Sequence, residues 1–243
     1  MTGELCVAVL SDVHGNLQAL QAVLADIKAR GAFDRIVTAG DHCLNGPDPG
    51  ESLELILARS TDVLKGNTDR DLVDEGQSDP ELGAKKRASI AWTRDTLGSD
   101  RIDVLDALPF SVRVTAPDGS TLQVVHANPL DLDRHIFPDI QDAELEQLVN
   151  AVDADVLVYG HLHIPFRQRF ANLRLFNIAS CGAPRDGDRR AVWGEFVWSR
   201  KQGWRGVIHR TPYDLGDAVL RIIDSGMPHP DKRIRDLLRA TYE

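Results

Sequence analysis

Three apolar stretches in the first part of the chain each end in a short polar loop. Residues 5–10, 35–39 and 61–65 have the length and composition of buried strands. The loops that follow them are Ser11-Asp12-Val13-His14, Gly40-Asp41 and Gly66-Asn67-Thr68-Asp69. Right-handed crossovers place successive strands of an open α/β sheet parallel, and ligands bind beyond the carboxyl ends of such strands. The pattern therefore predicts an α/β fold in which the three polar loops converge at one edge of a sheet.

Helix-like stretches separate these strands. Leucine and isoleucine recur at helical spacing between Asn16, an N-cap residue, and Gly31, a stop signal. The run Asp48-Pro49-Gly50-Glu51 predicts a second helix that begins with a capping box and continues to about Arg59. The segment from about 80 to 107 is expected to form one or two helices folded over the edge of the domain.

From residue 111 onward the pattern predicts a second sheet. Residues 111–115 and 121–126 are strand-like and are joined by a turn at Pro117-Asp118-Gly119. The elements expected to complete this sheet are a helix at 142–152 and strands at 155–159, 166–170, 174–178, 191–198 and 204–210. Helices at about 214–225 and 231–240 are expected to end the chain. Because no repeat or linker-like run divides the sequence, we expect one domain over residues 1–243 with a helical excursion at about 80–107.

Composition excludes several classes of protein. The 243 residues are 42% hydrophobic and 27% charged, as in globular rather than disordered or fibrous proteins. Lys and Arg number 28 against 37 Asp and Glu, and no basic stripe is present, so stable nucleic-acid binding is not expected. The apolar run at 5–10 follows Glu4 and is too short for a signal core or a membrane span. We therefore expect a cytoplasmic protein without a membrane partner. Cys6, Cys43 and Cys181 lack disulfide or zinc spacing and are expected to be reduced packing thiols.

Four of the eight histidines directly follow apolar strands: His14, His126, His161 and His163. A buried cluster of imidazoles and carboxylates needs compensation, and a pair of divalent cations is the simplest form of it. Side chains two apart at an extended strand end point to the same side, so Asp12 and His14 could hold one ion together. The same spacing relates His161 and His163.

The spacing favours two ions rather than one. Asp41 is the natural bridge, because a carboxylate can join two ions that lie roughly 3.5–4 Å apart. Asn67 offers a neutral carbonyl oxygen, and Gly40 and Gly160 let the backbone turn tightly beside the expected ligands. Mixed oxygen and imidazole ligands suit manganese, iron or zinc better than calcium.

The combined set of motifs resembles the calcineurin-like metallophosphoesterases. It comprises Asp12-x-His14, Gly40-Asp41, Gly66-Asn67, His126 and Gly160-His161-x-His163. Gly46-Pro47-Asp48-Pro49 and the loop at 177–187 are similar to the small bacterial and archaeal phosphodiesterase branch, near members that cleave diadenosine polyphosphates. The resemblance implies a two-sheet sandwich flanked by helices, in four layers α-β-β-α, with a dinuclear site at the sheet ends.

Carried over by position, the resemblance implies a ligand set and a mechanism. Asp12, His14 and His163 would bind one ion, Asn67, His126 and His161 the other, and Asp41 both. Catalytic roles would fall to Asp41, Asn67 and His126, with a metal-bridging hydroxide attacking phosphorus directly. Two divalent transition-metal ions are expected, manganese first, with iron, zinc, nickel or magnesium as alternatives.

One position departs from the family's usual pattern. Thr68 stands where many members carry a histidine that protonates the leaving group, and a hydroxyl is too weak an acid to replace it near neutral pH. His42 and His135 are candidate replacements. His135 and Arg185 are candidate substrate-binding residues, Arg185 because a guanidinium matches phosphate oxygens.

These residues predict a metal-dependent phosphoesterase that acts on a small phosphorylated substrate. A phosphodiesterase or nucleoside-polyphosphate hydrolase is the first reading. A phosphomonoesterase or protein phosphatase stays open, and so does a non-catalytic metal-binding scaffold, since a phosphoesterase-like subunit of the retromer complex serves protein binding. The sequence does not fix the oligomeric state and leaves a homo-oligomer open.

Overall fold

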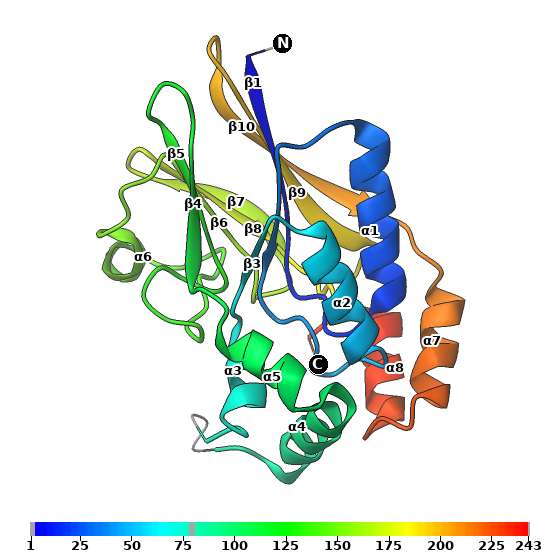
Figure 1. Cartoon of the computed structure of the whole chain (residues 1–243). Helices are drawn as coiled ribbons and strands as arrows, with labels where there is room; N and C mark the ends of the chain where they lie inside the picture. Colours follow the sequence, from blue (N-terminus) through cyan, green and yellow to red (C-terminus); the bar gives the residue numbers. More distant parts are fainter. Residues whose placement is uncertain (1–2, 78–80, 243) are drawn as a thin grey trace.

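Two five-stranded mixed sheets make up the β-structure of the chain (Figure 1). The computed structural model describes residues 3–77 and 81–242. The first sheet has the order β10-β9-β1-β2-β3, and its strands are β1 (Glu4–Leu10), β2 (Arg35–Ala39), β3 (Asp62–Leu64), β9 (Ala191–Ser199) and β10 (Gly203–Thr211). The second has the order β4-β5-β6-β8-β7, and its strands are β4 (Ser111–Thr115), β5 (Thr121–Val125), β6 (Val156–Tyr159), β7 (Pro165–Phe170) and β8 (Leu173–Ile178).

The strands β9 and β10 lie in the first sheet, so the expectation that they complete the second sheet is wrong. β9 runs antiparallel beside β1, with Glu4 opposite Ser199 and Val9 opposite Gly194. The side chains of Phe196 and Trp198 enter the core between the sheets. The amphipathic pattern of β9 suits either sheet, and only the pairing with β1 decides between them.

The helices are eight in number within residues 3–77 and 81–242. They are α1 (Leu17–Arg30), α2 (Pro49–Arg59), α3 (Asn67–Val73), α4 (Ala84–Leu97), α5 (Ser99–Asp106), α6 (Asp142–Val149), α7 (Leu215–Asp224) and α8 (Pro230–Arg239). None of those helices is both long and apolar enough to cross a membrane.

Apolar side chains hold the sheets and helices in four layers. One cluster between the two sheets includes Val9, Val124 and Val158. A second cluster joins the outer face of the first sheet to α1 and α2, and a third joins the outer face of the second sheet to α6. The predicted α-β-β-α sandwich is confirmed.

The N-terminal residues before α1 and α2 make different side-chain contacts. Asn16 caps α1, because its side-chain oxygen accepts a hydrogen bond from Ala19 N at 3.1 Å. α2 begins at Pro49 as expected, but Asp48 makes no side-chain cap. Its carboxylate instead accepts two hydrogen bonds from Arg221 Nε, at 2.9 and 2.8 Å. The predicted capping box is therefore wrong, since a charged fork to α7 takes the oxygens that the cap would use.

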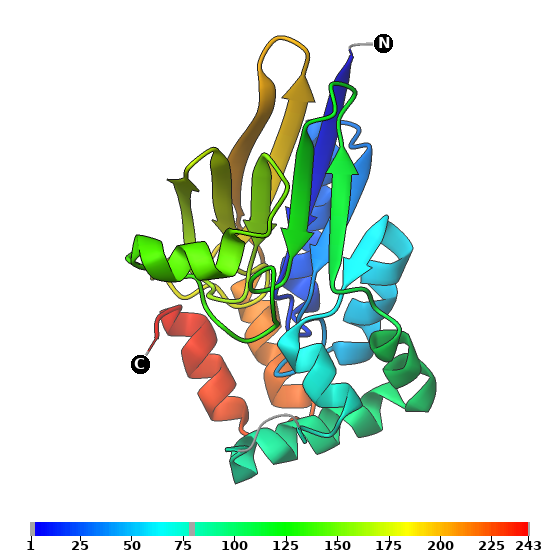
Figure 2. The ribbon, with the colours of Figure 1, turned by 90° about the vertical axis from the view of Figure 1, so that its left-hand side faces the viewer.

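Helices gather below the sheets, at the end where the strands β1, β2, β5 and β6 finish (Figure 2). The excursion after α3 forms two helices, α4 and α5, which pack on α3 and on the loop after β2. At the other end of the chain α7 and α8 pack together around Ile222 and Leu237. Trp92 of α4 packs against that same cluster, so the excursion and the C-terminal helices enclose one region beneath the sheets.

Candidate metal centre

Left-handed backbone turns place the candidate ligands. Asp12, His14, Asp41, His161 and His163 have φ values of 55°, 50°, 57°, 64° and 63°. Residues at the end of an extended strand would have negative φ, so the extended geometry expected for the pairs Asp12/His14 and His161/His163 is wrong. Each such residue costs of order 1 kcal/mol or more, and strain of this kind clusters at functional sites.

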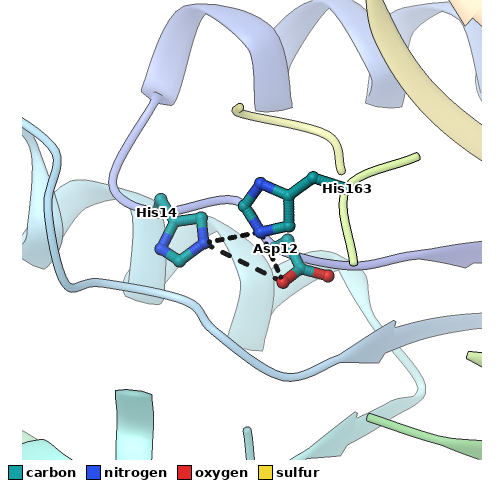
Figure 3. Close-up of side chains that lie close together, drawn as sticks. All are labelled: Asp12, His14 and His163. Atoms are coloured by element: carbon teal, nitrogen blue, oxygen red, sulfur yellow. Dashed lines mark hydrogen bonds and ion pairs between the residues drawn. The ribbon is translucent and has the colours of Figure 1, made fainter. Parts of the chain in front are cut away.

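The first group of ligands joins the loop after β1 to the loop after β6 (Figure 3). His163 Nε2 lies 3.0 Å from Asp12 Oδ1 and 3.2 Å from His14 Nε2. His14 Nε2 lies 3.8 Å from the same Asp12 oxygen. These three ligand atoms are close enough to share one metal ion.

The second group lies beyond the ends of β2, β3 and β5. His126 Nε2 lies 3.0 Å from Asn67 Oδ1 and 3.5 Å from Asp41 Oδ1. The ring of His161 packs edge-on against that of His126, with centroids 4.9 Å apart. His161 and His163 therefore separate into different groups, although their spacing in the sequence had suggested a shared ion.

Asp41 lies between the two groups. Its Oδ1 faces His126, while its Oδ2 is 3.7 Å from His14 Nε2. The side chain is almost fully buried, with 3% of the residue exposed. A bridging carboxylate needs this arrangement, with one oxygen directed at each group.

The hydrogen bonds of the rings show which nitrogen is available as a ligand. Nδ1 donates to a backbone carbonyl in three of them: His14 to Leu44 O at 2.9 Å, His126 to Ala39 O at 2.8 Å and His163 to Ala183 O at 2.6 Å. A carbonyl oxygen only accepts, so Nδ1 carries the proton and Nε2 presents a lone pair in the neutral ring. In His161 the roles reverse, because Nε2 donates to Asp133 O at 2.8 Å.

This donor set fits divalent transition metals. Lone pairs of imidazole nitrogens point at one another and at carboxylate oxygens, an arrangement that a cation between them would stabilise. Ring nitrogens held by backbone carbonyls are typical of metal-binding histidines. Imidazole, carboxylate and amide ligands together suit manganese, iron or zinc.

Charge interactions in the cluster point the same way. Burial raises the pKa of Asp41 to about 7, with His126 opposing the shift and the charges of Asp12 and Asp69 adding to it. Burial also acts to raise the pKa of Asp12, but the hydrogen bond and attraction to His163, together with attraction to His126 and His14, outweigh it and hold that pKa well below its usual range. Burial and repulsion from His163 lower the pKa of His14. Two buried carboxylates side by side favour the binding of positive charge.

Backbone packing keeps the loops close. A Cβ on Gly40, whose φ is 89°, would lie 2.6 Å from the Cα of Gly66 and 2.6 Å from His126 Nδ1. Asp69 ties the same loops together, since its Oδ2 accepts from the backbone N–H of both Asp41 and Gly66 at 2.8 Å. Its Oδ1 accepts from His42 N at 3.0 Å. Only a residue without a side chain fits at position 40.

A cavity of about 520 Å³ opens over the candidate ligands. The residues that line it include His14, Asp41, Asn67, His161 and His163. Its walls come from α4, from α8 and from the loop after β8.

The other candidate residues of the sequence divide into two sets. His135 lines the cavity and stacks on His161, with ring centroids 4.2 Å apart. Arg185 also lines it, and its guanidinium lies 3.8 Å from Asp236. His42 is fully buried, and its Nε2 donates to Leu64 O at 2.8 Å. The expectation that His42 could reach a leaving group is therefore wrong.

Sequence reasoning missed several features of this region. Asn67 begins the helix α3, where only a loop was expected. The Asp three residues after Gly66 is a capping-box signal that could have indicated this helix, and Asp69 does bond the Gly66 N–H. No pattern placed the C-terminal residues Arg233 and Tyr242 in the cavity wall, because their position depends on how α8 packs.

The fold and the ligand cluster define a class: α/β sandwich proteins with a candidate metal centre at the carboxyl ends of both sheets. The profile of the calcineurin-like phosphoesterase superfamily domain matches residues 5–195. The chain belongs to this superfamily, which supports a hydrolase acting on phosphoesters. The matched region ends within β9, so α7 and α8 lie outside it.

Relatives cover nearly the whole chain. An uncharacterized protein from Methanocaldococcus jannaschii is 31% identical, and the match covers 91% of this chain and 93% of that protein. The crystal structure of a metallophosphoesterase from Sphaerobacter thermophilus is 25% identical, covers 98% of this chain and 99% of its own, and superposes with a TM-score of 0.78. A hypothetical protein from Pyrococcus horikoshii shares the fold with a TM-score of 0.83 at 19% identity, over 98% of this chain and 100% of its own.

Proposed function

We propose that this protein is a metal-dependent phosphodiesterase or nucleoside-polyphosphate hydrolase. The observation that carries the proposal is the orientation of the rings of His14, His126 and His163. Each donates Nδ1–H to a backbone carbonyl and directs Nε2 towards a carboxylate or amide oxygen. A superfamily of phosphoesterases supplies the reaction class.

The ligands divide as the two groups do. Asp12, His14 and His163 would hold one ion, Asn67, His126 and His161 the other, and Asp41 would contact both. Such an ion pair supplies Lewis-acid stabilisation of phosphoryl oxygens and lowers the pKa of water. Manganese is the ion we expect first, because the ligands combine oxygen with imidazole nitrogen.

The protein's own groups orient the reactants. Asp133 O fixes the ring of His161 through Nε2, so that Nδ1 is the nitrogen left to act as a ligand. Asp69 fixes the backbone beneath Asp41 and thereby the direction of its two oxygens. On the cavity wall, His135 and Arg185 are placed to donate hydrogen bonds to a phosphoryl group. Thr68 supplies no strong acid, since an aliphatic hydroxyl is too weak an acid near neutral pH, and this one is also buried.

The test is an assay of the metal-free and manganese-loaded protein on three substrates. These are bis-nitrophenyl phosphate, mono-nitrophenyl phosphate and diadenosine tetraphosphate. We expect turnover of the first and third that depends on manganese. Asp41→Asn should lower it by about 10³-fold, because the bridging charge is worth several kcal/mol in the transition state. Bound metal measured by elemental analysis should fall in parallel.

Asp95→Asn is the matched control, since it removes a carboxylate from an exposed position on α4. It should leave both turnover and metal content unchanged. Fast cleavage of the monoester alone would instead indicate a phosphomonoesterase. Metal binding without turnover of any substrate would contradict the proposal and favour a scaffold.

A further inference from the structure

Arg233 is a buried cation in the cavity wall. It lies on α8, and only 7% of the residue is exposed. It lines the same cavity as the candidate metal ligands. Its Nε and Nη2 are buried, and neither has a hydrogen-bond partner among the residues that the structure describes. Guanidinium groups in protein interiors are normally paired, so this one lacks an expected partner.

The charge of Arg233 is poorly compensated by its surroundings. Burial lowers the pKa of Arg233 to about 10, with Tyr213 and Asp236 opposing the shift and Arg185 adding to it. The group is thus still protonated near neutral pH. Asp236 is the carboxylate nearby, but it already pairs with Lys232 at 2.6 Å and lies 3.8 Å from Arg185. Burying the charged guanidinium of Arg233 away from water without a full set of partners costs free energy. An anion bound to it would recover part of that cost.

Other cations line the same part of the cavity. Lys85 of α4, Lys232 of α8 and Arg185 join Arg233 around it. The chain as a whole carries a formal net charge of -9, so this gathering of positive charge runs against its composition. Asp41 and Asp236 also line the cavity, but Lys and Arg outnumber them, and an excess of positive charge attracts anionic ligands. Phosphoryl oxygens match the fork of a guanidinium in both charge and geometry.

We propose that Arg233 binds a second phosphoryl group of the substrate, beyond the one cleaved at the metal centre. The substrate is then a phosphoester with further phosphoryl groups, such as a nucleoside polyphosphate, rather than a simple diester. This inference rests on the proposed function and deepens it. Arg233 lies C-terminal to the part of the chain that the superfamily profile matches, residues 5–195.

The first experiment measures binding without catalysis. Tripolyphosphate is titrated calorimetrically into the protein in the presence of a chelator, so that metal ions do not contribute. Arg233→Met should weaken binding by about tenfold or more, because a charge-assisted hydrogen bond is lost. Arg235→Met is the matched control, since Arg235 is exposed on the same helix and does not line the cavity. Equal weakening in both variants would overturn the proposal.

Two further measurements test whether a loss of binding comes from a loss of folding and whether the site binds any anion rather than a phosphoryl group. Thermal unfolding of Arg233→Met should occur at the same or a higher temperature, since a buried unpaired charge is replaced by an apolar side chain. If that variant unfolds early, Arg233→Lys takes its place and should still weaken binding, because an ammonium cannot form the fork. Succinate should bind much more weakly than tripolyphosphate. Equal binding of the two anions would overturn the assignment to a phosphoryl group.

The second experiment measures kinetics of the manganese-loaded protein. Arg233→Met should raise KM for diadenosine tetraphosphate by about tenfold while kcat stays within about twofold. Kinetics on bis-nitrophenyl phosphate, which has no second phosphoryl group, should not change. Turnover of both substrates with no effect of Arg233 would overturn this inference and leave the proposed function standing. Arg233-dependent binding of tripolyphosphate without any turnover would support the subsite and contradict the proposed function.

Discussion

The metal centre and the outer wall of the cavity are built in opposite ways. The metal centre comprises the seven candidate ligands Asp12, His14, Asp41, Asn67, His126, His161 and His163. Its rings are held by hydrogen bonds to backbone carbonyls, and its carboxylates are nearly or fully buried. The outer wall comprises Lys85, Arg185, Lys232, Arg233 and Tyr242. Its members are long side chains whose contacts are mostly with other side chains, as in the cation-π contact of Arg185 with Tyr242 at 5.0 Å and the pairing of Lys232 with Asp236.

The difference indicates a division of roles, in which the metal centre would carry out the reaction and the outer wall would recognise the substrate. Groups fixed by the backbone at sheet ends keep their geometry when neighbouring side chains change, as a metal site requires. Groups on helices can be exchanged without disturbing the sheets, so they suit the choice of substrate. The outer wall also combines elements far apart in the chain, since α4 and α8 meet around Trp92 and Leu237.

The largest effect that tests this division is the dependence of rate on the leaving group. If the metal centre breaks the ester bond without an acid from Thr68, poor leaving groups should react slowly. We expect a nitrophenyl diester to be cleaved at least about 10²-fold faster than a simple dialkyl diester such as dimethyl phosphate, the amount that general-acid help normally supplies. The measurement is kcat/KM over a series of diesters of rising leaving-group pKa.

Variants of the outer wall should leave the slope of that series unchanged. Arg235→Met and Arg233→Met are the comparison, because neither touches the scissile bond. The division between the two regions would break down if Arg233→Met changed the slope. A flat series in the parent protein would show that another group, such as His135, protonates the leaving oxygen.

The two regions also differ in how well the sequence predicts them. The strand ends and the residues that follow them were recognisable, because period-two and apolar patterns locate a strand such as β2 to the residue. The convergence of Asp12 and Asp41 follows from the rule that carboxyl ends of parallel strands share an edge. His126 follows β5 of the second sheet and reaches them because the two sheets pack face to face. The backbone conformation of the ligand positions could not be predicted. The left-handed φ of Asp12 and His14 is set by close packing of loops, which no pattern in the sequence expresses.

The outer wall could not be predicted in the same way. α8 was expected as a helix, but its docking depends on the packing of Leu237 against α7 and Trp92. The same holds for β9, whose place in the first sheet depends on a pairing with β1 across most of the chain. Long-range packing decides both cases, and a single sequence carries little information about it.

A smaller effect is expected when the support beneath the metal centre is removed. Asp69→Asn replaces one carboxylate oxygen with an amide NH2 group. This group would face backbone N–H groups, so that two donors would lie opposite each other without an acceptor. The native carboxylate accepts from Asp41 N, Gly66 N and His42 N. Buried hydrogen bonds to a charged acceptor are worth about 2–3 kcal/mol, so the free energy of unfolding should fall by about that amount. Urea unfolding of the metal-free protein measures it.

Companion measurements test whether the Asp69 substitution affects the metal centre alone and leaves the outer wall unchanged. Asp103→Asn, at an exposed position on α5, should change stability by less than about 0.5 kcal/mol. Metal affinity of the Asp69 variant should drop, while its affinity for tripolyphosphate stays the same. Parallel losses of both affinities would show that the two regions are coupled and that their separation is wrong.

The smallest effect concerns the loop that joins the regions, residues 127–135, which carries both Asp133 and His135. Asp131 organises this loop: its carboxylate accepts hydrogen bonds from the backbone N–H of Asp133 at 3.0 Å and of Arg134 at 2.9 Å. Burial acts to raise the pKa of Asp131, but hydrogen bonds from Arg134 and Asn128 outweigh it and lower the pKa.

A lowered pKa in the folded protein means that ionised Asp131 stabilises the fold above its unfolded pKa of about 3.9. That contribution is complete near neutral pH and is lost as the pH falls from about 4 towards the folded pKa. Asp131→Asn should therefore unfold at lower urea concentration than the parent at pH 6, and the difference should shrink steadily below pH 4. The curves are recorded in chelator, with the exposed Asp139→Asn as the matched variant. A difference that stays constant from pH 6 to pH 2 would mean that the charge of Asp131 does not hold this loop, and His161 would then owe its orientation to Asp133 alone.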